Sequence, residues 1–120
     1  QAYAFRSLQA NGAVLALGSD APIATPDVLA GVRAACTRMD ADGRELTPNE
    51  RLSVEEALAG YTRGAAYAVQ REGSSGMLRA GFDADLVVLS HEPDMAAPDP
   101  QVLATIKAGA VTHSSGDVDL

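Results

Sequence analysis

The sequence predicts an α/β fold, and three patterns carry this prediction. Residues 14–18 (VLALG) form an apolar run of strand length, which is typical of a short strand buried on both faces, as in a parallel sheet. Helix-start signatures follow at Thr25 and at Ser53. Residues 86–89 (LVVL) give the strongest β signal in the chain. The sequence thus predicts both strands and helices in one chain of moderate length.

Length and composition limit the core that this chain can form. A chain of 120 residues is long enough for one domain of ordinary size. Hydrophobic residues make up 47% of it, but many of these are alanine, aromatic residues make up only 4%, and tryptophan is absent. Because an alanine side chain buries little area, a core built from this chain alone would be thin.

The beginning of the chain resembles the end of a helix. Residues 4–10 have helical character, and Asn11 and Gly12 are residue types that end helices. The chain does not begin with Met. We therefore expect it to be a piece of a longer polypeptide.

Charge and cysteine usage exclude several classes of protein. The net charge of −7 and the pI near 4.6 argue against a nucleic-acid partner, because such affinity depends on Lys and Arg that neutralise phosphates. Cys36 is the only cysteine and lies on the apolar side of a predicted helix, which indicates a buried thiol in a reducing cytoplasm rather than a nucleophile. The sequence contains no signal peptide and no apolar run of about 18 residues, so we expect a cytoplasmic chain without a membrane span.

The next expected element is a helix that starts at Thr25 and runs to about Met39. Thr25 offers an N-cap oxygen, Pro26 suits the first helical position, and the helix dipole favours Asp27. Apolar residues recur at helical spacing through the segment. A polar loop at residues 40–44 follows it.

A longer helix is expected at residues 54–69. Ser53 and Glu56 have the spacing of a capping box, in which each side chain accepts a hydrogen bond from the other residue's amide. Gly60 and Gly64 lower the helix propensity but permit another backbone to approach closely. We therefore expect this helix to lie tightly against a larger body.

The last third of the chain predicts strands. Residues 77–79 indicate a short strand, and residues 86–89 form the next one. Residues 102–106 fit either a short helical turn or the beginning of a strand. A tight turn near Gly109 predicts a last hairpin, and residues 114–120 have the character of a frayed tail.

Asp20 is the first candidate site residue. It lies at or just past the C-terminal end of the strand predicted at residues 14–18, which is where functional groups gather in α/β sheets and barrels. A carboxylate in that place can bind a metal or accept a proton from water. The alternative is that Asp20 caps the next turn or helix.

Three other residues are weaker candidates for a catalytic role. Ser19 has a hydroxyl beside Asp20, but no histidine lies near it in the sequence and no Gly-x-Ser-x-Gly turn is present. Asp83 and Asp85 have the side chains of an acid–base pair, yet their position favours a turn into the following strand. We assign loop and turn roles to all three residues.

Four segments taken together resemble the amidohydrolase superfamily of metal-dependent hydrolases, specifically its amidohydrolase-3 branch. They are residues 18–22 (GSDAP), 53–58 (SVEEAL), 61–66 (YTRGAA) and 76–89 (GMLRAGFDADLVVL). The last segment is the most specific, and order and spacing agree over residues 3 to 113. The resemblance implies the C-terminal piece of a (β/α)8 barrel, followed by strands of a small composite β-sandwich.

The resemblance also implies a division of the chain and an activity. Residues 1–72 would supply the last barrel strand and helices, and residues 73–120 the C-terminal strands of the sandwich. The implied reaction is hydrolysis of C–N bonds in small amides or cyclic amides by water that a divalent metal, Zn²⁺ above others, activates. Asp20 matches the aspartate after the eighth barrel strand, which in many members binds the metal and accepts a proton from the water.

The family's other metal ligands have no counterpart in this sequence. A His-x-His pair, a carboxylated lysine or acidic residue and the histidines of the middle strands are absent, and His91 and His113 match none of these motifs. We expect both histidines to be exposed. Because catalytic Zn²⁺ takes about three protein ligands, we expect the chain alone to be inactive.

A non-catalytic role is the alternative. A lone central strand leaves unpaired amides and an apolar flank, which favours association between copies. The chain would then be a structural or self-associating module, and homo-oligomers are expected in either case.

Overall fold

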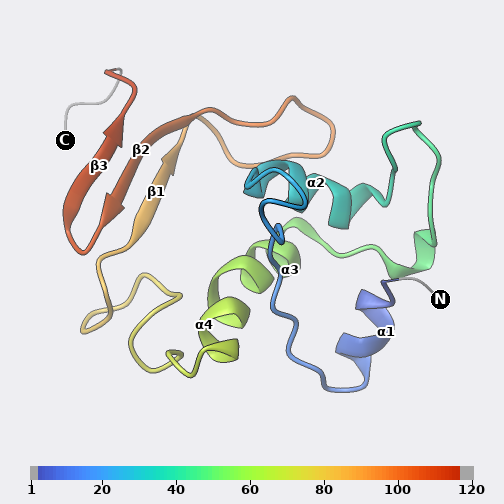
Figure 1. The fold of residues 1–120 in the computed structure, drawn as a ribbon, viewed down its shortest axis with the longest axis horizontal. Helices are drawn as coiled ribbons and strands as arrows, with labels where there is room; N and C mark the ends of the chain where they lie inside the picture. Colours follow the sequence, from blue (N-terminus) through green and yellow to red (C-terminus); the bar gives the residue numbers. More distant parts are fainter. Residues whose placement is uncertain (1–2, 117–120) are drawn as a thin grey trace.

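The computed structural model describes residues 3–116 (Figure 1). Helices occupy the first part of the chain and a small sheet the last part, so the expected α/β content is confirmed. The elements in order are α1 (Phe5–Ala10), α2 (Val28–Thr37), η1 (Pro48–Glu50), α3 (Val54–Ala59), η2 (Gly60–Gly64), α4 (Ala65–Ala68), β1 (Leu86–Leu89), β2 (Val102–Lys107) and β3 (Ala110–Ser114). Among these residues no helix combines the length and the apolar character needed to cross a membrane.

The helices enclose a small core. α2 packs on α3, and the buried cluster between the helices consists of Val32, Ala35, Cys36, Leu52 and Ala57. Val32 is the largest side chain that is fully buried among the described residues. The core is thin, as the composition predicts, because the small side chains in it bury little area. Burial also raises the pKa of the Cys36 thiol, which fits the expected structural role of this residue.

The second helix begins later and ends earlier than the sequence indicates. Asp27, not Thr25, is the N-cap of α2, and its carboxylate accepts a hydrogen bond from Ala30 N at 3.1 Å. Pro26 therefore precedes the helix, because Asp27, two positions after Thr25, caps it at least as well. Arg38 ends the helix in the left-handed region with φ 58°.

Residues 54–68 form one continuous helical run, as expected. Glu56 N donates to Ser53 Oγ at 3.1 Å, and Ser53 N donates to the Glu56 carboxylate at 2.7 Å, so the capping box is confirmed. The run passes through α3, the π-helical turn η2, and α4. The wide turn in its middle contains both Gly60 and Gly64.

The sheet has three antiparallel strands in the order β1–β2–β3. Ala108 and Gly109 join β2 to β3, and their positive φ angles of 50° and 79° are those of a tight hairpin turn. Asp85 fixes this turn to the entry of β1, since its carboxylate accepts a hydrogen bond from Ala108 N at 2.7 Å and pairs with Lys107. The expected hairpin is confirmed, and the strand alternative for residues 102–106 is correct. The expected tail lies mainly outside the described residues.

Residues 77–79 contain no strand, so that expectation is wrong. The surrounding segment folds back on itself through local hydrogen bonds. Ser74 N and Ser75 N both donate to Arg71 O, and Asp83 N donates to Ser74 O. These bonds close a compact loop, and residues 77–79 join none of the strands of the sheet.

The strand expected at residues 14–18 belongs to no sheet in the described part of the chain. Val14 is 57% exposed, whereas Leu15 and Leu17 are partly buried, so burial on both faces is wrong for this chain. A strand buried on both faces needs hydrogen-bonded neighbours and a layer of side chains above and below. Among the described residues, Leu15 and Leu17 pack on the helical core, whereas Val14 and Ala16 are exposed.

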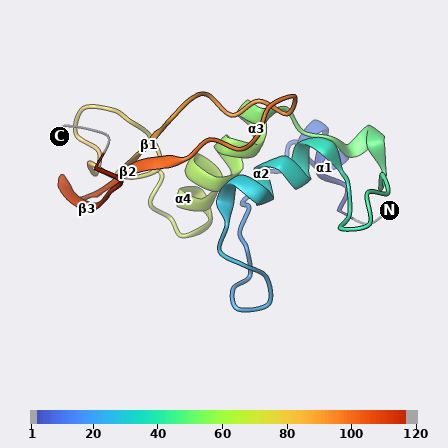
Figure 2. The same ribbon diagram turned by 90° about the horizontal axis from the view of Figure 1, so that it is seen from above.

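The molecule is more open than a compact protein of its mass. Its accessible surface is 7993 Å², whereas a folded monomer of this mass exposes about 6,100 Å². The radius of gyration is 15.3 Å, against about 13.6 Å for a compact chain of this length. The sheet lies at one end and α1 at the other (Figures 1 and 2). The structure therefore presents a large surface that its own elements leave uncovered.

Two glutamates fasten α1 to the rest of the helical layer. Ser7 N donates to Glu50 at 2.8 Å, and Ser7 Oγ donates to the other oxygen of the same carboxylate. Arg6 donates to both oxygens of Glu56 at 2.7 and 2.8 Å. The Ser7 hydroxyl is the largest cause that lowers the pKa of Glu50, and the hydrogen bond from Ser53 N is the largest that lowers the pKa of Glu56.

Acid should weaken the attachment of α1. Because the fold lowers the pKa of Glu50 and Glu56, their contribution to stability is complete above the ordinary glutamate pKa of 4.5 and is lost as the pH falls through the folded-state values below it. We expect the urea midpoint, followed by circular dichroism, to fall once the pH drops below 4.5. Glu50→Gln should be less stable at pH 7 and less sensitive to acid, and an unaltered pH profile in this variant would contradict the account.

Candidate functional site

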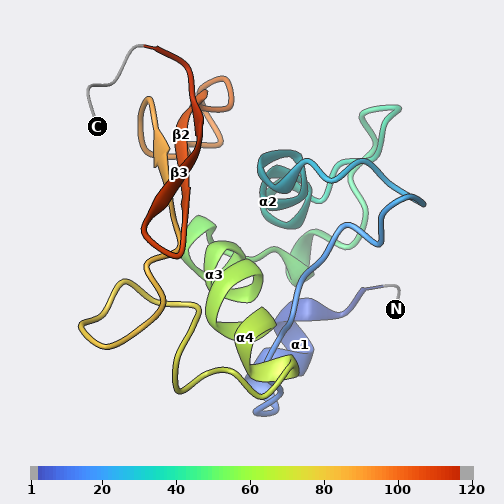
Figure 3. The same ribbon diagram turned by 60° about the vertical axis from the view of Figure 1, so that its left-hand side comes forward.

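The segment that leads to Asp20 runs along the helical turn η2 (Figure 3). Leu17 N donates to Gly60 O at 3.1 Å, and the same carbonyl accepts a hydrogen bond from Ala65 N inside the helix. The bond from Ala65 N to Gly60 O spans five residues, as in a π-helix. The helix is therefore widened at Gly60, whose carbonyl also accepts the hydrogen bond from Leu17. The helical run thus holds the segment that carries Asp20 by a backbone hydrogen bond.

Two glycines permit this close approach. A Cβ at Gly64 would lie 1.9 Å from Leu15 O, and a Cβ at Gly60 would lie 2.8 Å from Leu17 Cγ. A side chain at either position would force its neighbour to move, the backbone carbonyl of Leu15 at Gly64 and the side chain of Leu17 at Gly60. The expected close approach of another backbone is confirmed at Gly64, where that backbone is Leu15, whereas the space beside Gly60 is filled by the side chain of Leu17.

Asp20 lies in a left-handed turn that exposes its side chain. Its φ of 54° is one that Asp tolerates better than most residues, and its carbonyl accepts a hydrogen bond from Ile23 N at 2.8 Å. The loop between α1 and α2 projects away from the other elements (Figure 2). Within residues 3–116 the Asp20 carboxylate accepts no hydrogen bond, and Asp27 caps α2. The carboxylate is therefore open to a group outside the described chain.

The residues beneath this loop pack against one another. Gly18 lines a cavity of about 260 Å³ together with the ring of Tyr61. The Tyr61 hydroxyl packs against Gly31, where an added Cβ would lie only 2.0 Å from the hydroxyl oxygen. Burial raises the pKa of Tyr61. Arg38 is buried and stacks over the ring of Phe5 at 5.2 Å. These contacts give the base of the loop a structural role.

The other carboxylate candidates have structural partners. Asp83 pairs with Arg71 at 2.7 Å, and Asp85 holds the hairpin turn through Ala108 and Lys107. The hydrogen bond from Lys107 is the largest cause that lowers the pKa of Asp85. These partners agree with the turn roles assigned to both aspartates.

The two histidines are exposed, as expected. His91 contacts Ser90 Oγ at 3.0 Å through Nδ1 and Pro98 O at 3.2 Å through Nε2, while His113 lies in β3. No group of three His, Cys, Asp or Glu side chains in residues 3–116 is arranged to hold a metal ion. The described residues therefore do not make up a metal site by themselves, and Asp20 can offer one ligand at most.

Sequence analysis did not single out Arg33. Its guanidinium contacts a loop more than 60 residues away, between β1 and β2. Neither the helix pattern around Arg33 nor the proline-rich loop indicates this pairing, because hydrogen bonds to backbone carbonyls leave no signature in a single sequence.

Comparisons with known proteins agree with the fold and with the motifs. A model of the amidohydrolase family matches residues 1–113. The YtcJ protein of Bacillus subtilis is 38% identical over 109 residues, which cover 88% of this chain and 21% of that protein. The N-substituted formamide deformylase of Arthrobacter pascens is 32% identical over 112 residues, which cover 90% of this chain and 21% of that enzyme.

A solved structure has the same fold. The crystal structure of an amidohydrolase from Thermotoga maritima MSB8 matches 92% of this chain with a TM-score of 0.71 and 24% sequence identity, and the match covers 25% of that protein. The chain spans about a fifth of the length of the curated relatives it matches.

Proposed function

The chain belongs to the amidohydrolase family, and from this premise we propose that it acts as the C-terminal part of a larger metal-dependent enzyme that hydrolyses C–N bonds of small amides or cyclic amides. One relative is named for the deformylation of N-substituted formamides, which are amides. The observation that carries the proposal is the exposed Asp20 carboxylate on a projecting turn, without a partner among residues 3–116. An exposed carboxylate without a partner is available to a catalytic site whose other residues come from elsewhere in the enzyme.

In this proposal the two parts of the chain have different places in the parent enzyme. Residues 1–72 supply the eighth strand and last helices of a (β/α)8 barrel, and residues 73–120 supply C-terminal strands of a small β-sandwich. Two observations support this division. Residues 13–18 lie against a helical run and have no strand neighbour in the described chain, and the antiparallel sheet forms a separate unit at one end. Neighbouring barrel strands would supply what the first segment lacks.

Asp20 has two tasks in the proposed reaction. It offers one carboxylate ligand to a divalent metal, for which Zn²⁺ is our choice, and the remaining ligands come from other parts of the enzyme. The metal, when bound, supplies the activation of water. The Asp20 carboxylate accepts a proton and returns it to the leaving nitrogen, as a general base and then a general acid. The single free Cys36 suits a reducing compartment such as the cytoplasm.

The isolated chain should not turn over substrate. We expect no hydrolysis of simple amides by the 120-residue chain when Zn²⁺ is added in excess, because one carboxylate does not hold a catalytic zinc ion. Release of amine from the amide is the measurement. Turnover that scales with the concentration of this chain would contradict the proposal.

Self-association is the second candidate function, and the open surface favours it. The chain exposes about 1,900 Å² more than a compact protein of its mass, which exceeds the roughly 800 Å² that each partner buries in a standard interface. In this case the chain is a structural module whose copies cover one another. Sedimentation at several concentrations separates the two candidates, because a clean monomer at high concentration argues against the module.

A further inference from the structure

The loop between β1 and β2 leaves the sheet and lies along α2. It comprises residues 90–101, and both Figure 1 and Figure 2 show it over the helical layer. Reciprocal hydrogen bonds close its base, since Ser90 N donates to Gln101 O at 3.0 Å and Gln101 N donates to Ser90 Oγ at 3.0 Å. The loop therefore begins and ends at the sheet, and its middle part extends over the helices.

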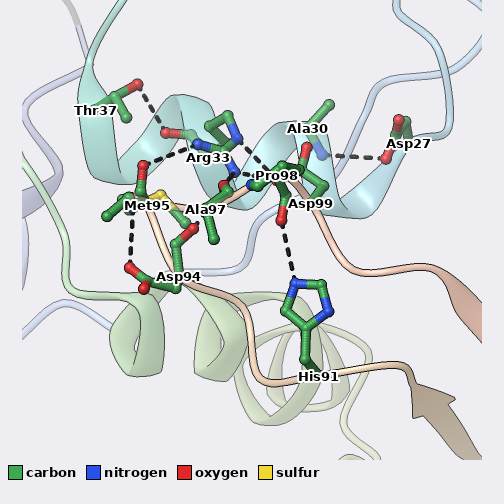
Figure 4. A network of polar contacts seen from close by, with 11 residues as sticks. Asp27, Ala30, Arg33, Thr37, His91, Asp94, Met95, Ala97, Pro98 and Asp99 are labelled. Atoms are coloured by element: carbon green, nitrogen blue, oxygen red, sulfur yellow. Dashed lines mark hydrogen bonds and ion pairs between the residues drawn. The ribbon is translucent and has the colours of Figure 1, made fainter.

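Arg33 of α2 is the polar anchor of this loop (Figure 4). Its guanidinium donates from Nε to Asp99 Oδ1 at 2.8 Å, from Nη1 to Met95 O at 3.2 Å, and from Nη2 to Ala97 O at 2.6 Å. Nη2 also lies 2.6 Å from Asp99 Oδ1 and 3.5 Å from Asp94 O. One side chain thus binds a carboxylate and three carbonyls of the same loop, which the fixed fork of an arginine permits and a single ammonium does not.

The loop is shaped to present these acceptors. Asp94 Oδ1 accepts a hydrogen bond from Ala96 N at 2.9 Å, and Ala97 N donates to Asp94 O at 3.2 Å. His91 Nε2 contacts Pro98 O at 3.2 Å, and the Met95 side chain packs on the helical core. These contacts hold the carbonyls of residues 94, 95 and 97 toward one guanidinium.

The placement of the sheet depends on connections of this kind. The principal contacts between elements join helix to helix or strand to strand. An apolar cavity of about 830 Å³ lies between β1 and the helical run from α3 to α4, lined by residues of both. Close packing therefore does not fix how the sheet lies relative to the helices. This placement depends on the two segments that connect them, residues 69–85 and the loop at residues 90–101.

We propose that Arg33 holds the C-terminal sheet on the helical layer by binding the carbonyls and the carboxylate of the 90–101 loop. This role goes beyond the proposed catalytic function and does not depend on Asp20. It requires the guanidinium fork as well as the positive charge, so lysine does not replace arginine here.

The test uses Arg33→Lys in the full 120-residue chain. Hydrogen exchange of the amides in residues 90–101 should become about tenfold faster or more, because several charge-assisted hydrogen bonds are lost, while the exchange of residues 54–68 stays as in the wild type. Spin labels at Ala30→Cys and His113→Cys, in a Cys36→Ala background, should report a broader distance distribution between α2 and β3.

Arg44→Lys is the matched control, because Arg44 pairs with Asp42 at 3.6 Å on the exposed surface. It should change neither readout. Asp99→Asn keeps the shape of the loop and should give a smaller effect confined to residues 90–101, so it tests the anchor even if Arg33→Lys does not fold. Unchanged exchange and distances in both variants, or faster exchange spread evenly through residues 54–68, would overturn the proposal.

Discussion

Gly64→Ala should abolish the native packing between the helical run and residues 13–18. The added Cβ would lie 1.9 Å from Leu15 O, and a backbone carbonyl cannot rotate away as the end of a side chain does. Overpacking of this kind costs about 3 kcal/mol, which outweighs the gain of about 1 kcal/mol that alanine brings to a helix. Because the core of this chain is thin, we expect a large decrease in the urea midpoint of unfolding, measured by circular dichroism.

Two other glycines serve as controls for this prediction. At Gly73 nothing lies within 4 Å of an added Cβ, so Gly73→Ala should leave the urea midpoint nearly unchanged. At Gly60 the obstacle is the side chain of Leu17, which can shift, so Gly60→Ala should be intermediate. A Gly64→Ala variant as stable as Gly73→Ala would show that residues 13–18 do not lie against the helix in solution.

The parts of the fold that could be predicted are those that local chemistry determines. Ser53 and Glu56 satisfy each other's amides within one helical turn, so their spacing alone predicted where the helix begins. The turn at Gly109 was predictable because a tight hairpin needs residues that accept positive φ. The start of α2 was placed two residues too early because Thr25 and Asp27 are both good caps, and only the hydrogen bond to Ala30 N decides between them.

Partners that are distant in the sequence could not be predicted. The pairing of Ser7 with Glu50 and that of Arg33 with Asp99 connect elements 43 and 66 residues apart, and no periodicity indicates them. The run at residues 14–18 was predicted as a strand from its composition, but composition does not say whether neighbouring strands exist in the same chain. A strand pattern requires partners before it becomes a strand.

The candidate site was predictable only in part. Asp20 stood out because it follows an apolar run at a Gly-Ser-Asp turn, and its exposure on a projecting loop agrees with a role outside the chain's own core. The turn roles of Asp83 and Asp85 also agree with the sequence. The rest of a metal site could not be predicted from this chain, since residues 3–116 contain no group of three or more His, Cys, Asp or Glu side chains that could hold a metal ion.

Asp20→Asn should remove activity without removing stability. In the parent polypeptide that carries this chain, we expect kcat to fall about 10²- to 10⁴-fold, the usual contribution of a general acid–base group. The urea midpoint should stay the same, because the Asp20 carboxylate has no partner among the described residues to lose. Asp42→Asn is the matched control, since Asp42 is an exposed loop aspartate whose ion pair with Arg44 is loose, and it should keep full activity. A parallel loss of stability in Asp20→Asn would indicate a structural carboxylate instead.

Reconstitution offers the sharpest test of the claim that this chain lends one carboxylate to a larger catalytic centre. The 120-residue chain would be mixed, in the presence of Zn²⁺, with a polypeptide that comprises the rest of the proposed parent enzyme, and amide hydrolysis would be followed as amine release. We predict that the wild-type chain restores turnover, and that the Asp20→Asn chain binds equally well but restores at most about one hundredth of it. Equal rescue by the two chains would contradict the account.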